Sequence, residues 1–132
     1  MNYYFSTELI NLTFEEAILK TKEALKKEGF GVLTEIDMKN TLKQKLDVDI
    51  LKYKILGACN PSMAYQALQV ENKIGTMLPC NVIVQEKGQG NIEIAAVDPA
   101  ASMQAIKNDA LVSIAKKVRA KLEQVIQNLA NE

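Results

Sequence analysis

A Cys-Asn pair occurs twice in the sequence, at Cys59-Asn60 and at Cys80-Asn81. A thiol can act as a nucleophile, carry sulfur or bind a soft metal ion, and a side-chain amide can orient a ligand through hydrogen bonds. Pro61 directly follows the first pair, so Asn60 is predicted to cap a helix that begins there. Cys59, Asn60, Cys80 and Asn81 together are the candidate ligand-binding residues of this chain.

The chain contains no histidine, which narrows the chemistry that these residues could perform. Ser-His-Asp and Cys-His catalytic groups and histidine-based metal or haem sites are excluded. A nucleophilic cysteine would need activation by a helix N-terminus or by a lysine. Two thiols are too few for a structural zinc site within one chain, but Cys59 and Cys80 could hold a soft metal ion, or four thiolates could meet across a two-fold axis. The sequence identifies no cofactor, and it contains no glycine-rich phosphate loop.

Three functions remain open from the sequence. The first is a dimeric domain that binds a small ligand, a sulfur species or a soft metal ion near Cys59 and Cys80. The second is a thiol-dependent redox or sulfur-transfer enzyme that uses one of these cysteines as its nucleophile. The third is a structural or interaction protein whose thiols are buried and inert, because free cysteine is among the most frequently buried residue types.

The composition predicts a soluble globular protein. The 132 residues are 48% hydrophobic and 24% charged, which suits one domain over residues 1–132. Sixteen basic and sixteen acidic residues give no net charge, so no nucleic-acid partner is expected. Because no apolar run approaches the roughly 20 residues of a membrane span and no secretory signal is evident, we expect a cytoplasmic protein with free cysteines and no membrane partner.

Local signals predict strands that alternate with helices. Alternating apolar residues predict strands over 3–9, 30–36, 50–58, 80–85 and 92–97. Apolar residues at helical spacing, together with capping residues, predict helices over 14–28, 38–46, 61–72 and 109–129. In the strand over 50–58, the side chains of Leu51, Tyr53 and Ile55 are predicted to face the core.

This order of elements predicts an α+β fold. An open, mostly antiparallel sheet with the main helices on one face, plus short extra helices, gives both long amphipathic helices an apolar surface to cover. If the strands over 50–58 and 80–85 are antiparallel neighbours, Cys59 and Cys80 come to the same edge of the sheet. The uncovered face or an edge strand is a natural surface for self-association, so a homodimer is the expected partner.

Some segments are distinctive in their order and spacing, namely Gly57-Ala58-Cys59-Asn60-Pro61, residues 64–68, residues 74–82 and Asp98-Pro99. With these segments the chain resembles the bacterial and archaeal family catalogued as domain of unknown function number 302. The resemblance implies a β-α-β4-α arrangement similar to the TATA-binding-protein-like fold, a tendency to form homodimers and no established activity. It also implies that cysteine at positions 59 and 80 marks a subgroup of the family. The likeness of fold carries no inference of DNA binding.

Overall fold

The centre of the molecule is an antiparallel sheet of five strands, ordered β1-β5-β4-β3-β2. It is described here from a computed structural model that covers residues 2–132. The strands are β1 (Tyr4–Leu9), β2 (Gly31–Asp37), β3 (Tyr53–Cys59), β4 (Cys80–Glu86) and β5 (Ile92–Val97). β1 and β2 form the two edges of this sheet.

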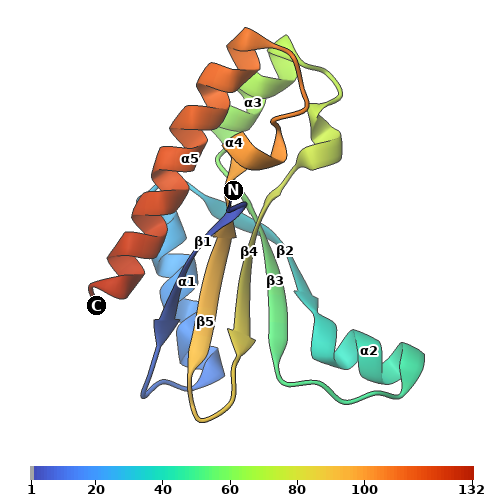
Figure 1. The fold of residues 1–132 in the computed structure, drawn as a ribbon, viewed down its shortest axis with the longest axis vertical. Coiled ribbons are helices and arrows are strands. Elements are labelled where there is room, and N and C mark those ends of the chain that lie inside the picture. The colour runs from blue at the N-terminus through green and yellow to red at the C-terminus, as the bar shows by residue number, and fades with distance from the viewer. Residues whose placement is uncertain (1) are drawn as a thin grey trace.

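The two longest helices pack beside each other on one face of the sheet. The helices are α1 (Phe14–Lys27), α2 (Met38–Leu46), α3 (Pro61–Val70), α4 (Pro99–Ser102) and α5 (Asp109–Ala130), with a short 3-10 helix η1 (Ile74–Met77). Figure 1 looks onto the other face of the sheet, with α1 behind the strands. The expected α+β class, with an open antiparallel sheet and its main helices on one face, is therefore confirmed. None of the helices within residues 2–132 is both long enough and apolar enough to span a membrane.

The main core lies between the sheet and helices α1 and α5. Its fully buried side chains include Leu25 of α1, Leu56 and Val82 of the central strands, and Leu122 and Leu129 of α5. Burying one such side chain contributes roughly 1.5–3 kcal/mol to folding. The start of α1 is fixed by the predicted capping box: the Thr13 hydroxyl accepts the Glu16 N–H at 3.0 Å, and the Glu16 carboxylate accepts the Thr13 N–H at 2.9 Å.

A second, smaller core lies beyond the end of the sheet. Figure 1 shows α5 running past the strands to pack against α3 and α4. The buried side chains of this cluster are Ala67, Ile74, Met103, Leu111 and Ala115. One long helix therefore covers both cores, and the two cores meet where β3 passes into α3.

The side chains of β3 point to the opposite faces of the sheet from those that the sequence predicts. Leu56 and Ala58 lie in the core, whereas Tyr53 and Ile55 pair with Gln85 and Ile83 on the uncovered face of the sheet. Leu51, which precedes the strand, is 55% exposed. The prediction was wrong because β3 carries apolar residues on both of its faces, so alternation alone cannot choose the inner one.

α2 forms an arm at the β2 edge of the sheet, as Figure 1 shows. Asp37 caps this helix by accepting the Asn40 N–H at 2.9 Å, as its sequence position predicts. None of the side chains of α2 is buried. The arm therefore adds little to either core.

Candidate functional site

The two Cys-Asn pairs lie at the same end of two neighbouring strands. β3 and β4 pair antiparallel, with Ala58 opposite Cys80 and Gly57 opposite Asn81. The backbones therefore converge as the strand order predicts. Cys59 is one residue beyond the partner of Cys80, at the point where β3 ends and α3 begins.

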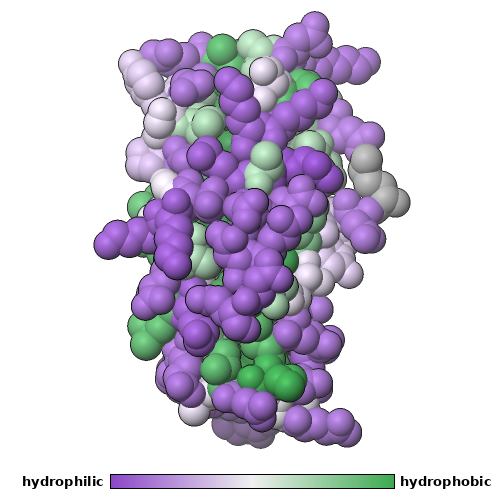
Figure 2. Space-filling view, turned by 90° about the vertical axis from the view of Figure 1, so that its left-hand side faces the viewer, coloured by the Kyte–Doolittle hydropathy of each residue, from purple (hydrophilic) through white to green (hydrophobic). Residues whose placement is uncertain are grey.

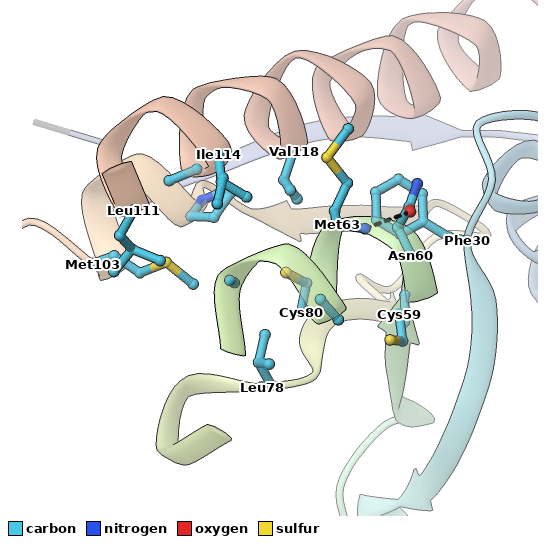
Figure 3. Close-up of a pocket in the computed structure, with 15 residues that line it drawn as sticks. Phe30, Cys59, Asn60, Met63, Leu78, Cys80, Met103, Leu111, Ile114 and Val118 are labelled. Carbon is cyan, nitrogen blue, oxygen red and sulfur yellow. Dashed lines mark hydrogen bonds between the residues drawn. The ribbon is translucent and has the colours of Figure 1, made fainter. Parts of the chain in front are cut away.

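The side chains of these residues do not all point to one place. Successive side chains of a strand point to opposite faces, so Cys80, which shares a face with Ala58 and Val82, points toward the helices, and Cys59 points the other way. Figure 3 shows the two sulfur atoms directed away from each other. Asn81 is exposed on the uncovered face. The four candidate residues are thus divided between the two sides of the sheet.

A small apolar cavity opens beside Cys80, where the two cores meet. Its volume is about 30 Å³. The lining side chains come from the residue before β2, the end of β3, the start of β4, helices α3 and α5, and the α4 region. They are Phe30, Ala58, Cys59, Asn60, Met63, Ala64, Ala67, Leu78, Cys80, Pro99, Met103, Leu111, Ile114, Ala115 and Val118. Four of these residues carry sulfur, and Figure 3 shows Met63, Cys80 and Met103 on different sides of the cavity.

The Cys80 thiol is held in its neutral form. Its side chain is buried, and the residue is only 7% exposed. Burial in apolar surroundings, with a smaller contribution from negative charge on Cys59, raises the pKa of Cys80 from 9.0 to about 11. At neutral pH, Cys80 is therefore a poor nucleophile on its own but a soft donor that can lose its proton to a metal ion.

Asn60 has the structural role that its sequence position predicts. Its side-chain oxygen accepts the Met63 N–H at 3.2 Å and caps α3. The amide nitrogen packs closely against Gly29, where an added Cβ would lie 3.0 Å from it. Gly29 also has a φ of +87°, which favours glycine. Asn60 therefore holds the first turn of α3, and with it Met63, against the cavity.

Because Gly57 has no side chain, Thr34 and Pro79 can pack against the backbone of β3 on the uncovered face of the sheet. A Cβ at Gly57 would lie 2.2 Å from Thr34 Oγ1 and 2.7 Å from Pro79 Cγ. The ring of Pro79 and the hydroxyl of Thr34 thus close over the backbone of β3 on the uncovered face. The peptide bond between Leu78 and Pro79 is cis.

The sequence does not identify the other residues that line the cavity, among them Met63 and Met103. Met63 lies three residues after Asn60 in the same helix, so its helical spacing from the cap was a usable signal. Met103 follows α4 and reaches the cavity only through tertiary packing, for which the sequence carries no local signal. Within residues 2–132, no group of three histidine, cysteine, aspartate or glutamate side chains is arranged to hold a metal ion. Any metal at this site would therefore need the thioethers as donors.

Comparison with known proteins gives a family and a fold. The family model described as "Domain of unknown function DUF302" matches residues 5–129. A solved structure titled "Crystal structure of uncharacterized conserved protein DUF302 from Bacillus stearothermophilus" is similar, with 26% sequence identity and a TM-score of 0.87 over 96% of this chain and 98% of that chain. No curated protein matches the chain. The match to the family model spans nearly all of the sequence, and the chain belongs to the DUF302 family.

Proposed function

We propose that the chain is a binding module that holds a small, soft species in the cavity beside Cys80. The observation that carries this proposal is an apolar cavity lined by the sulfur-containing side chains of Met63, Cys80 and Met103. A volume of about 30 Å³ holds little more than one or two water-sized groups. The ligand is therefore a single ion or a species of very few atoms.

The chemistry of the lining favours a soft monovalent cation such as Cu(I). Thiolates and thioethers are the donors that Cu(I) prefers, and the cavity offers Cys80, Met63 and Met103. A site of one thiolate and two neutral thioethers around Cu(I) has no net charge, which suits an apolar cavity because burying an unpaired charge is costly. Binding releases the thiol proton of Cys80 to solvent. A sulfur species is the other ligand class that these donors suit.

A Cu(I) titration tests this proposal. The protein is titrated anaerobically with Cu(I) in the presence of a chromophoric Cu(I) chelator as the competitor. We expect one Cu(I) per chain, an affinity at least about 100-fold lower in Cys80→Ser, and about 10-fold lower in Met63→Leu or Met103→Leu. The effect of Cys80→Ser is the largest because it removes the charge that balances the ion.

Met77→Leu is the matched control. Met77 lies in η1, is 40% exposed and does not line the cavity. Its replacement is expected to leave the affinity for Cu(I) unchanged. Absence of binding, or equal binding by the wild type and Cys80→Ser, would contradict the proposal and favour a structural or interaction protein with inert thiols.

A redox enzyme that uses both cysteines as a dithiol is disfavoured by the same geometry. The two side chains leave the sheet on opposite sides, and a disulfide requires Cβ atoms that approach each other. We expect diamide treatment of the folded protein to form no bond between Cys59 and Cys80 within one chain. Mass spectrometry of alkylated peptides measures the fraction of chains that carry this disulfide. A stoichiometric intrachain disulfide would contradict this expectation and favour the redox enzyme.

The partner that we propose for this module is a second copy of the same chain. The sheet has helices on only one face, and the other face carries apolar side chains in four of its strands. Two-fold dimers are the most common soluble oligomers.

A further inference from the structure

The only arginine in the sequence lies in a surface hollow between α5, α4 and the start of β1. Arg119 is on α5, and every other basic residue of the sequence is a lysine. The hollow has a volume of about 750 Å³, and its polar lining includes Asp98, Gln104, Lys116 and Arg119. Figure 1 shows the start of β1, the end of β5 and α4 beside α5. None of these residues lines the cavity proposed for Cu(I), so the two sites are separate.

The guanidinium group of Arg119 is held in one orientation by two contacts. Its Nε–H donates to Asp98 Oδ2 at 3.0 Å, and its Cζ atom lies 5.0 Å from the centroid of the Phe5 ring. Asp98 is itself fixed, because it is only 7% exposed and its Oδ1 accepts the N–H groups of Ala100 at 3.0 Å and Ala101 at 3.4 Å. An arginine that is already oriented loses less conformational entropy when a ligand binds.

These contacts leave part of the guanidinium group available to a ligand. Within residues 2–132, no protein group accepts a hydrogen bond from Nη1 or Nη2 of Arg119. Lys116 lies three residues earlier on the same face of α5, is exposed, and forms no ion pair in this part of the chain. Both cations line the hollow, and the carboxylate of Asp98 balances only one of them. The hollow therefore attracts a group with a single negative charge.

A second, apolar hollow adjoins the first along α5. Its volume is about 220 Å³, and it shares Ala100, Gln104 and Lys116 with the first hollow. Its remaining lining residues are apolar, namely Met103, Leu111, Val112 and Ala115. Figure 2 shows the α5 side of the molecule as mainly hydrophilic, with apolar patches between the polar side chains. A ligand whose anionic group lies beside Arg119 has room for a short apolar chain in the second hollow.

We propose that the two hollows together bind a small organic acid. Its carboxylate lies between Arg119 and Lys116, and its apolar chain lies beside Val112. A carboxylate has two oxygens in one plane, which match the planar N–H donors of a guanidinium group. One carboxylate also neutralises the excess positive charge of the first hollow. Inorganic phosphate carries more charge at neutral pH and has no apolar part to occupy the second hollow. This site is independent of the Cu(I) proposal.

A nuclear magnetic resonance titration of the full chain tests this proposal. Because the sequence has one arginine, a ¹⁵N–¹H spectrum contains one arginine Nε–H signal, which reports on Arg119 directly. We expect hexanoate to shift this signal and to saturate it with a Kd of about 1 mM, since a small ligand at an open site makes few contacts. Acetate is expected to bind at least about 10-fold more weakly, because it has no chain to bury in the second hollow. Inorganic phosphate is also expected to bind more weakly than hexanoate.

Three substitutions separate the parts of the site. Lys116→Gln is expected to weaken hexanoate binding about 3-fold, as the loss of an exposed charge contact does. Lys117→Gln is the matched control, because it makes the same charge change on the same helix but does not line either hollow. It is expected to leave the affinity nearly unchanged. Val112→Ser is expected to weaken hexanoate binding about 3-fold and to leave acetate binding unchanged, because Val112 contacts only the apolar chain. Thermal unfolding of each variant confirms that it is folded.

The remaining outcomes would overturn the proposal. The Nε–H signal would stay in place at tens of millimolar hexanoate if the hollow bound no carboxylate. Equal affinities for acetate and hexanoate would mean that the second hollow holds no apolar chain. Tighter binding of phosphate than of hexanoate would make this a phosphate site instead. Equal losses in Lys116→Gln and Lys117→Gln would indicate general attraction to the charge of α5 rather than binding in the hollow.

Discussion

Gly57→Ala is expected to destabilise the protein by about 3 kcal/mol, an unusually large effect for the addition of one methyl group. The new Cβ would lie 2.2 Å from Thr34 Oγ1 and 2.7 Å from Pro79 Cγ, distances that real Cβ atoms do not adopt. Gly57 is buried in the middle of the sheet, so the backbone of β3 cannot move aside without disturbing both neighbouring strands. Urea unfolding of the variant and the wild type measures the difference.

Two further glycines serve as matched controls for Gly57. A Cβ at Gly31 or at Gly75 would have no heavy atom within 4 Å, and neither residue has a positive φ. Gly31→Ala and Gly75→Ala are therefore expected to change the free energy of unfolding by less than about 1 kcal/mol. If Gly57→Ala loses no more stability than Gly31→Ala or Gly75→Ala, then Thr34 and Pro79 do not pack closely over Gly57.

The Thr34 hydroxyl is the closer of the two contacts, which allows a rescue experiment. In the double variant Thr34→Ala, Gly57→Ala, the atom 2.2 Å from the new Cβ is gone and Pro79 Cγ remains. We expect this double variant to regain part of the stability that Gly57→Ala loses. A double-mutant cycle gives this coupling energy directly, and strictly additive losses would contradict a contact between the two positions.

Local chemistry made most of the elements predictable. The capping box of Thr13 and Glu16 and the caps of Asp37 and Asn60 mark helix starts, and each forms the expected hydrogen bond. These motifs act over three residues, so their geometry follows from the sequence alone. The antiparallel sheet with helices on one face follows from the need of two long amphipathic helices for an apolar surface.

The facing of β3 and the arrangement of the thiols depended on information that no local pattern contains. β3 is apolar on both faces, so its inner side is decided by which face the helices cover. The convergence of Cys59 and Cys80 required only that their strands be neighbours. Their opposite directions required the register, which pairs Cys80 with Ala58 rather than with Cys59.

The cavity was unpredictable for a related reason. Met63 and Met103 are 40 residues apart in the sequence, where a methionine usually indicates only a core position. They line the same cavity because α5 packs against both the α3 and the α4 regions. A void at the meeting point of two cores is a product of packing between elements, and it has no signature in any one of them.

Raising the pH from 9 to 11 is expected to lower the free energy of unfolding by about 2 kcal/mol through Cys80 alone. The pKa of Cys80 is about 11 in the folded protein, compared with an ordinary value of 9.0. Well below pH 9 both states keep the thiol proton, so the stability then has no pH dependence from this group. Between pH 9 and pH 11 the unfolded chain loses the proton while the folded chain keeps it. Alkaline conditions therefore favour the unfolded state until the folded thiol also ionises.

Comparison with Cys80→Ala isolates this effect from other groups that titrate in the same range. Lysines and tyrosines are present in both proteins, so the difference between the two stability curves belongs to Cys80. Cys59→Ala is expected to keep most of the pH dependence, because burial is the larger cause of the raised pKa of Cys80 and the charge of Cys59 the smaller one. Parallel curves for the wild type and Cys80→Ala would mean that the thiol is solvated in the folded protein. An ionised, solvated Cys80 would in turn remove the apolar, charge-neutral environment on which the proposed Cu(I) site depends.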